Sequence, residues 1–272
     1  MLHKLGLAKA SQINQGPVTL AHLLPSACID LDATIADSYG GAGQVWKNLV
    51  ASPADGSPSA SYNFYRGATA AAHTDDPGFA GPAGEAGAHW LFDGGDAFKQ
   101  TTTTPLLSNL HKAGGGSFTM IAAFHHQLSS AEQRLFSTQS NGASTQGISF
   151  AISGVKKLLL RQAGDSGTAV ASVVPVTLTG TDYACIVTHD RAAGKSRFWI
   201  NSRTPIEYTH NFQPAGGSSF PGTIGARATF DTEFMAANTR LYSFGLLNAS
   251  IDSTQAGIIY DLLNARHNRV YA

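Results

Sequence analysis

From about residue 28 onward, the chain alternates short apolar runs with clusters of small polar residues. The runs are rich in valine, isoleucine, phenylalanine, tyrosine and threonine, and turn-forming residues separate them. Runs of this length and composition predict β-strands. The expected strands cover residues 28–33, 44–50, 61–66, 89–93, 96–100, 117–127, 133–139, 147–153, 156–162, 169–178, 182–190, 196–201, 204–210, 222–227 and 238–247. Many short strands at close spacing predict an all-β fold, an antiparallel β-sandwich of the jelly-roll type.

One short helix is predicted near the C-terminus. Asp252 can cap its first turn, and Gln255 follows three residues later, which is the spacing of a capping box. An apolar stripe then follows at helical spacing, formed by Ile258, Ile259, Leu262 and Leu263.

The first 26 residues read as an extended arm that precedes a single domain over 27–272. The arm contains seven leucine and valine side chains but shows no sustained period. Such a segment gains stability only when it buries its apolar groups against a partner or against its own domain. We expect the arm to act as an anchor.

Residues 67–88 form the clearest loop, with two prolines and five glycines. A loop of this length inside a domain is usually functional or mobile. His73, Asp75 and Asp76 lie in it and are candidate ligand-binding residues.

Charge limits the possible partners. The chain has 18 basic and 18 acidic residues, and charged residues make up 13% of it, against about 25% in an ordinary domain. This balance argues against a nucleic-acid-binding surface. No apolar stretch approaches the ~20 residues of a membrane helix, so no membrane insertion is expected. A surface with so few charges suggests a protein that works inside an assembly or outside a cell.

The two cysteines, Cys28 and Cys185, lie in apolar, strand-like surroundings. We interpret them as small buried hydrophobic residues. A disulfide between them stays open, because sequence alone does not decide it.

An ordered series of weak motifs resembles a known superfamily. It comprises Ile29–Ala33, Val45–Leu49, Trp90–Asp96, Phe118–Phe124, Leu135–Ser137, Gly147–Phe150, Arg197–Asn201, Gly222–Gly225 and Leu241–Phe244, followed by the helix. This series resembles the concanavalin A-like, laminin G-like jelly-roll domains over roughly residues 27–268. Ser202 stands where the family usually has a glycine.

The resemblance implies possible calcium binding, since laminin G-like domains often bind calcium. Asp93 and Asp96 are the candidate metal ligands, although the Gly-Gly turn between them explains both residues better. Asp30 and Asp32 would share one face of a strand, and we interpret that face as solvated rather than calcium-binding. No other cofactor is expected.

Catalysis is disfavoured. Glycosidases of this fold use paired carboxylates on one strand. The chain has only four glutamates, none with an acidic residue two positions later. Several aromatic residues could stack on sugars, although aromatic residues on strands more often belong to the core. These are Tyr62, Phe64, Tyr65, Trp90 and Trp199, of which Trp90 is a candidate ligand-binding residue.

Domains of this kind recur in bacteriophage tail and capsid proteins. The sequence therefore leads us to expect a non-enzymatic virion protein of a phage-like particle, in a tail, fibre or capsid decoration. It would join other virion proteins through the arm, form a homo-oligomer and attach to a host surface glycan or protein. The alternative is a secreted or cell-surface carbohydrate-binding module, and a glycan-degrading enzyme comes third.

Overall fold

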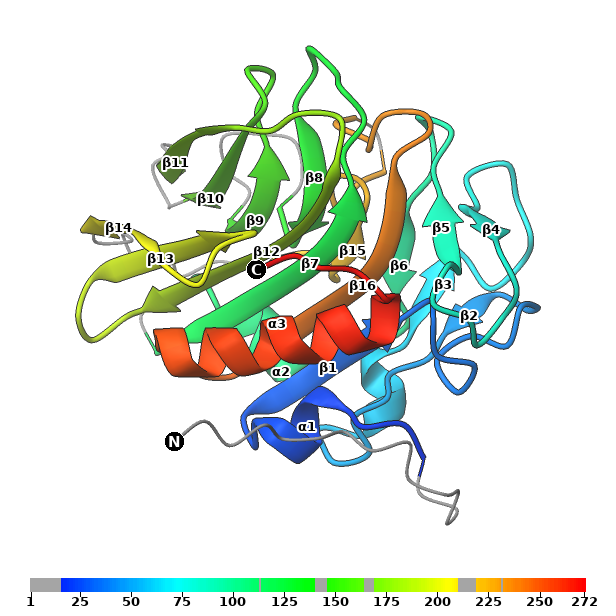
Figure 1. Ribbon diagram of the computed structural model, residues 1–272, viewed down its shortest axis with the longest axis horizontal. Coiled ribbons are helices and arrows are strands. Elements are labelled where there is room, and N and C mark those ends of the chain that lie inside the picture. Colours follow the sequence, from blue (N-terminus) through cyan, green and yellow to red (C-terminus); the bar gives the residue numbers. More distant parts are fainter. Residues whose placement is uncertain (1–15, 113, 140–145, 164–168, 210–218, 231) are drawn as a thin grey trace.

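The chain folds into two antiparallel β-sheets packed face to face, with a helix across the outside of one of them (Figure 1). This computed structural model describes residues 16–112, 114–139, 146–163, 169–209, 219–230 and 232–272. The predicted all-β sandwich is confirmed.

Sheet A lies in front in Figure 1. Its strands run in the spatial order β14 (Ile206–Thr209), β13 (Lys195–Ile200), β12 (Asp182–Asp190), β7 (Phe118–His125), β16 (Arg240–Leu247), β5 (His89–Leu91) and β4 (Gly78–Ala80), and β1 (Ala27–Asp32) also pairs with β16. Sheet B has the order β11 (Ala169–Thr177), β10 (Lys157–Ala163), β9 (Gly147–Ile152), β8 (Gln133–Ser137), β15 (Thr223–Ile224), β6 (Phe98–Gln100), β3 (Phe64–Arg66) and β2 (Val45–Trp46). The chain crosses between the sheets several times, so each sheet is assembled from distant parts of the sequence.

The predicted C-terminal helix is α3 (Ser253–His267), and its capping box forms as expected. The backbone N–H of Gln255 donates to Asp252 Oδ1 at 2.9 Å, and the Asp252 N–H donates to Gln255 Oε1 at 3.1 Å. The pattern did not predict four shorter elements. These are α1 (Leu20–Leu23), η1 (Ser59–Tyr62), α2 (Pro105–Asn109) and β4.

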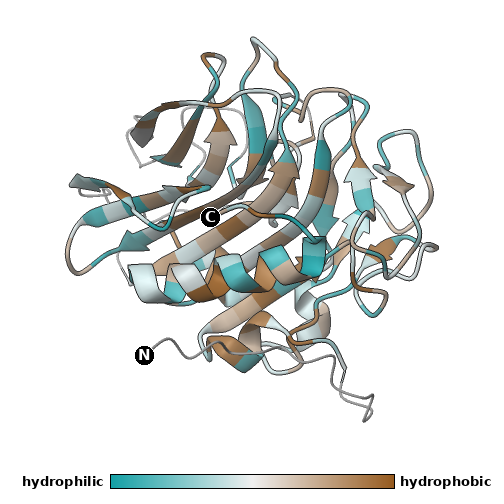
Figure 2. Cartoon of the chain, in the orientation of Figure 1, coloured by the Kyte–Doolittle hydropathy of each residue, from teal (hydrophilic) through white to brown (hydrophobic). Residues whose placement is uncertain are grey.

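Two apolar cores hold the molecule together. The larger core fills the space between the sheets and contains the fully buried Trp46, Trp90, Phe98 and Phe136. The second lies between the outer face of sheet A and α3, where Ile121 and Trp199 meet Ile259 and Leu263. Figure 2 shows hydrophobic residues along the central strands of sheet A, behind the helix. Helix α3 thus shields an apolar strip of that sheet from solvent.

Residues 16–26 pack on their own domain. Leu20 and Leu24 are buried in the second core. The carbonyl oxygen of Val18 accepts a hydrogen bond from Arg266 Nη2 at 2.6 Å. Residues 1–15 of the expected arm lie outside the described residues, and the anchoring of the arm to a partner stays a prediction.

The solvated face expected for Asp30 and Asp32 is wrong, because both carboxylates are buried on β1. Arg266 donates to Asp30 Oδ1 and Oδ2 at 2.8 and 2.9 Å and lies 3.2 Å from Asp32 Oδ2. His267 Nε2 lies 3.2 Å from the same Asp32 oxygen. A charged network therefore joins the end of α3 to β1.

Candidate functional site

The long loop is closed by the residues that were predicted to bind a ligand. The ring of His73 lies 2.8 Å from Asp75 Oδ1 through its Nδ1 atom. Asp75 Oδ2 accepts the Ala68 N–H at 3.0 Å, and Asp76 Oδ2 accepts the His73 N–H at 3.2 Å. The structure brings the three residues together, and their side chains bond within the loop.

The candidate calcium residues form a turn. Asp96 Oδ2 accepts the Asp93 N–H at 2.8 Å, and Asp93 Oδ1 accepts the Gly95 N–H at 2.8 Å. Burial raises the pKa of Asp96 to about 7. Calcium prefers six to eight oxygen ligands, and the described residues bring no group of three acidic, histidine or cysteine side chains together as metal ligands. This turn does not supply that ligand set.

Trp90 lies in the core between the sheets. Its side chain has no exposed surface, and its ring packs against Trp46, Phe98 and Tyr39. Tyr62, Phe64 and Trp199 are also fully buried. In this conformation none of these four residues presents a ring face to a sugar.

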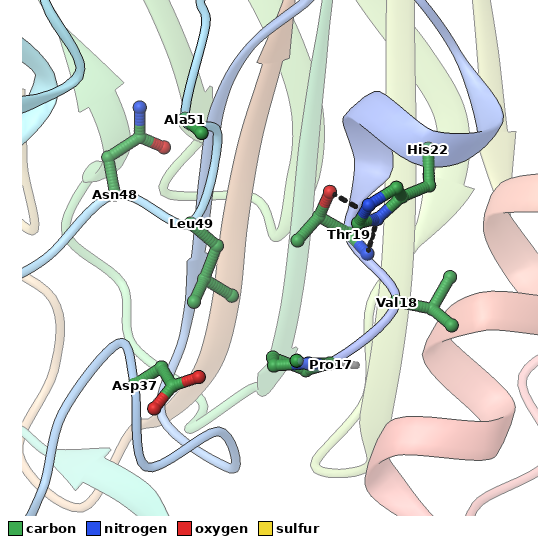
Figure 3. Close-up of a pocket in the computed structure, with 9 residues that line it drawn as sticks. Pro17, Val18, Thr19, His22, Asp37, Asn48, Leu49 and Ala51 are labelled. Carbon is green, nitrogen blue, oxygen red and sulfur yellow. Dashed lines mark hydrogen bonds between the residues drawn. The ribbon is translucent and has the colours of Figure 1, made fainter. Parts of the chain in front are cut away.

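An open pocket of about 790 Å³ lies beside the N-terminal segment (Figure 3). Figure 3 shows Asp37 and Leu49 on one side, with Pro17 and Thr19 on the other. Much of its polar lining already has partners. The Asn48 side chain accepts the Asp30 N–H and donates to the carbonyls of Cys28 and Val50. Nδ1 of His22 accepts the Thr19 N–H.

A chain of alternating charges covers part of the outer face of sheet B, and we take it as the candidate site. Three arginines and two glutamates form it, in the order Arg161, Glu132, Arg134, Glu233 and Arg227. We call this set the arginine–glutamate chain. Its formal charge is +1.

The strands of sheet B position the first part of the chain. Ser149 on β9 is directly opposite Arg161 on β10, and Ser149 Oγ accepts from Arg134 on β8. Arg161 donates to both oxygens of Glu132, at 2.8 and 3.1 Å. The polar side chains share one face because side chains alternate along a strand while their apolar neighbours point into the core.

The segment after β15 supplies the rest by folding back over the sheet. The Arg134 N–H donates to the Glu233 carbonyl at 3.0 Å, and the Gly225 N–H donates to the Arg134 carbonyl at 3.1 Å. Glu233 has a φ of +60°, a conformation that is uncommon outside glycine and often marks a functional position. Its carboxylate contacts both Arg134 and Arg227.

Electrostatics keep this carboxylate ionised. Burial raises the pKa of Glu233, but the hydrogen bond from Arg227 and the charge of Arg134 outweigh burial and bring the pKa below its ordinary value. Arg134 is almost fully buried, whereas the side chains of Arg161 and Arg227 are 24% and 18% exposed. The chain therefore has two partly exposed arginines, and each forms an ion pair with a glutamate.

No sequence pattern singled out this site. The available signal was the pair Glu132 and Arg134 at the start of a predicted strand, followed by Arg161 in the predicted strand over 156–162. Arg227 and Glu233 lie on a segment about a hundred residues away, and only the fold brings them there.

Comparisons with known proteins give a fold and no family. No protein-family model matches the chain, and no curated protein matches it. Among solved structures, the chain is similar to a Trypanosoma rangeli sialidase in complex with sialic acid, with a TM-score of 0.52 and 12% identity over 89% of this chain and 33% of the sialidase. The chain thus spans about a third of that sialidase, and the likeness shows the sandwich fold.

Two other similar structures have TM-scores below 0.5. One is the K499G mutant of the NanB sialidase from Streptococcus pneumoniae, with a TM-score of 0.48 and 16% identity over 62% of this chain and 27% of that one. The other is the CBM40 of a Ruminococcus gnavus IT-sialidase bound to α2,3-sialyllactose, with a TM-score of 0.47 and 11% identity over 65% of this chain and 96% of that one.

These findings correct the function expected from the sequence. The virion protein was the wrong main interpretation, because the similar structure with a TM-score above 0.5 is a sialidase. The virion location and virion partners lose their support with it, and the homo-oligomer stays a prediction. No helix among the described residues is long and apolar enough to cross a membrane.

Proposed function

We propose that this chain is a non-catalytic carbohydrate-binding domain of the concanavalin A-like type, secreted or at a cell surface, that takes an acidic sugar at the arginine–glutamate chain. The observation that carries the proposal is the pair of partly exposed arginine side chains, Arg161 and Arg227, each ion-paired to a glutamate beside the outer face of sheet B. A planar guanidinium matches a carboxylate with two parallel hydrogen bonds.

The surplus charge supports an acidic ligand. Three arginines face two glutamates, so a carboxylate that joins the chain neutralises it. Two arginines lie near the surface, while Arg134 is held beneath them by Glu132, Glu233 and Ser149. Pre-positioned side chains lose little freedom on binding, which favours affinity.

The same contacts support binding rather than hydrolysis. A glycosidase needs one carboxylic acid that donates a proton to the leaving group. Glu233 has a lowered pKa and is held ionised by two arginines, so it has no proton to donate near neutral pH. The similar Trypanosoma rangeli sialidase is in complex with sialic acid, which makes a sialylated sugar the first ligand to try.

Isothermal titration with 3′-sialyllactose, and with lactose as the neutral control, tests the proposal. We expect sialyllactose to bind at least about tenfold more tightly than lactose, a difference of about 1.4 kcal/mol. Arg161→Ala should weaken sialyllactose binding about tenfold, since this arginine is partly exposed. Arg203→Ala, at an exposed ion pair between the segment after β13 and Asp261 on α3, is the matched control and should bind like the unchanged chain.

Equal binding of the two sugars, or unchanged binding in Arg161→Ala, would overturn the proposal. Release of free sialic acid from sialyllactose during the titration would overturn its non-catalytic part.

A further inference from the structure

A second group of basic side chains gathers at one end of the outer face of sheet A, on the opposite side of the sandwich. Asp182, His125 and Arg240 are directly opposite one another on β12, β7 and β16. Cβ atoms of opposed residues lie about 4.5–5.5 Å apart. His89 on β5 is close by, with its ring centroid 6.0 Å from that of Tyr242.

The C-terminal segment completes this group. Figure 1 shows the chain turning back across sheet A after α3. Arg269 Nε donates to Asp182 Oδ2 at 2.9 Å, and its guanidinium lies 4.0 Å from the centroid of the Tyr242 ring. Nη1 of Arg269 donates to the carbonyls of Ala86 and His267. Contacts with four residues thus fix the position of Arg269.

Asp182 orients the neighbouring ring of His125. Asp182 Oδ1 lies 2.9 Å from His125 Nδ1 and accepts from the Tyr242 hydroxyl at 3.0 Å. Because Nδ1 faces the carboxylate, Nε2 is the ring nitrogen left for other contacts. The His125 side chain is 28% exposed. Asp182 therefore fixes the His125 ring beside Arg240, and Nε2 becomes an N–H donor there when the ring is protonated.

Positive charge in this group exceeds negative charge. Arg240 is exposed, and among the described residues it forms no ion pair. Burial lowers the pKa of His89, and the charges of Arg240 and Arg269 lower it further against the opposing pull of Asp182. One carboxylate thus faces two arginine side chains, and an anion bound among them would offset the surplus positive charge.

We propose that His89, His125, Arg240 and Arg269 form a binding site for a tetrahedral oxyanion, such as a sulfate or phosphate ester. This site goes beyond the proposed function, because it lies on the other sheet and shares no residue with the arginine–glutamate chain. The guanidinium of Arg240 supplies the exposed charge. Nδ1 of His125 faces Asp182 and Nδ1 of His89 donates to the Gly87 carbonyl, so each ring offers an Nε2–H donor to the anion when it is protonated. Asp182 and Tyr242 position these donors without contacting the ligand.

Nuclear magnetic resonance of the chain with isotope-labelled histidine rings tests this site directly. Sodium sulfate is titrated at about pH 6.5, the ordinary pKa of histidine, with sodium chloride holding the ionic strength constant. We expect the ring signals of His125 and His89 to shift and saturate. Arg240→Ala should weaken sulfate binding at least fivefold without unfolding the chain, because this side chain is exposed.

Two control variants define specificity. Arg203→Ala removes an exposed arginine outside this group, and Arg161→Ala removes one from the other sheet. Both should bind sulfate like the unchanged chain. Shifts that rise without saturation, unchanged binding in Arg240→Ala, or an equal loss in Arg203→Ala would each overturn the proposal.

Two modified sugars distinguish a sulfate ester from a phosphate ester as the source of the oxyanion. Glucosamine 6-sulfate and glucosamine 6-phosphate are compared with unmodified glucosamine in the same experiment. Preference for the sulfate assigns the site to sulfated glycans, and preference for the phosphate assigns it to phosphate esters. Binding of glucosamine as tight as either ester would overturn an oxyanion site.

Discussion

Gly67 begins the long loop in a conformation that side chains rarely adopt. Its φ is +67°, and an added Cβ atom would lie 2.4 Å from Asp76 Oδ1 and 2.8 Å from Asp75 Oδ1. The two carboxylates that close the loop therefore pack directly against the missing side chain. This is a turn position that only glycine fits without strain.

We expect Gly67→Ala to lower the free energy of unfolding by about 1–3 kcal/mol, because it combines backbone strain with a close contact. Gly87→Ala is the matched control at the other end of the loop, since Gly87 has ordinary φ and open space around its Cβ position. Urea denaturation measures both variants. Equal midpoints would contradict this account of the loop.

At the scale of elements, Arg266 fastens α3 to β1. Its side chain is 6% exposed and satisfies Asp30 and Asp32, which are 2% and 0% exposed. Removing one partner of a buried ion pair leaves an uncompensated charge and typically costs about 3–5 kcal/mol. Arg266→Met should show a loss of that size in urea denaturation, whereas Arg203→Met should lose less than about 1 kcal/mol at its exposed ion pair.

The same network makes stability depend on pH. Burial raises the pKa of Asp32, but His267, Arg266 and Thr34 outweigh burial and hold the pKa below its ordinary value of 3.8. A carboxylate whose pKa is lower in the folded chain than in the unfolded chain stabilises the fold at pH values above its unfolded pKa. This stabilisation is lost as the pH falls through the folded pKa. The difference in the free energy of unfolding between the unchanged chain and Asp32→Asn should therefore become smaller below about pH 4. A constant gap down to pH 2 would contradict the predicted coupling.

The cap of α3 offers a smaller and independent effect. Asp252→Ala removes the acceptor for the Gln255 N–H and should cost about 1 kcal/mol. Asp252→Asn keeps an oxygen acceptor and should lose only a fraction of that. Thermal unfolding of the two variants measures the difference, and identical transitions would show that the cap contributes nothing.

Local patterns predicted the long elements, because each one carries its own signal. The strand over 182–190 and the capping box at Asp252 came from neighbouring residues alone. Helix α2 has five residues and β4 has three, too few for a period to show. Asp30 looked solvated because its partner Arg266 is 236 residues away, and the arginine–glutamate chain was missed for the same reason.

At the scale of the whole molecule, the two cysteines lie on strands that differ in the number of strands they pair with. Cys185 lies on β12, which pairs on both sides with β7 and β13, whereas Cys28 lies on β1, which pairs with β16 alone. Both thiols are free and fully buried, and burial raises the pKa of Cys28 to about 11. A thiol reacts only as an exposed thiolate, so labelling reports the opening of its surroundings.

If residues 27–272 unfold as one cooperative unit, both thiols should react with a chromogenic disulfide reagent at one rate, which rises with urea as the global unfolding rate does. Cys28→Ala and Cys185→Ala each leave a single thiol, so the two rates can be measured separately. Faster labelling of Cys28 without denaturant would show that β1 and the N-terminal segment open before the sheets separate. We expect equal rates, because Arg266 ties β1 to the same helix that covers β12.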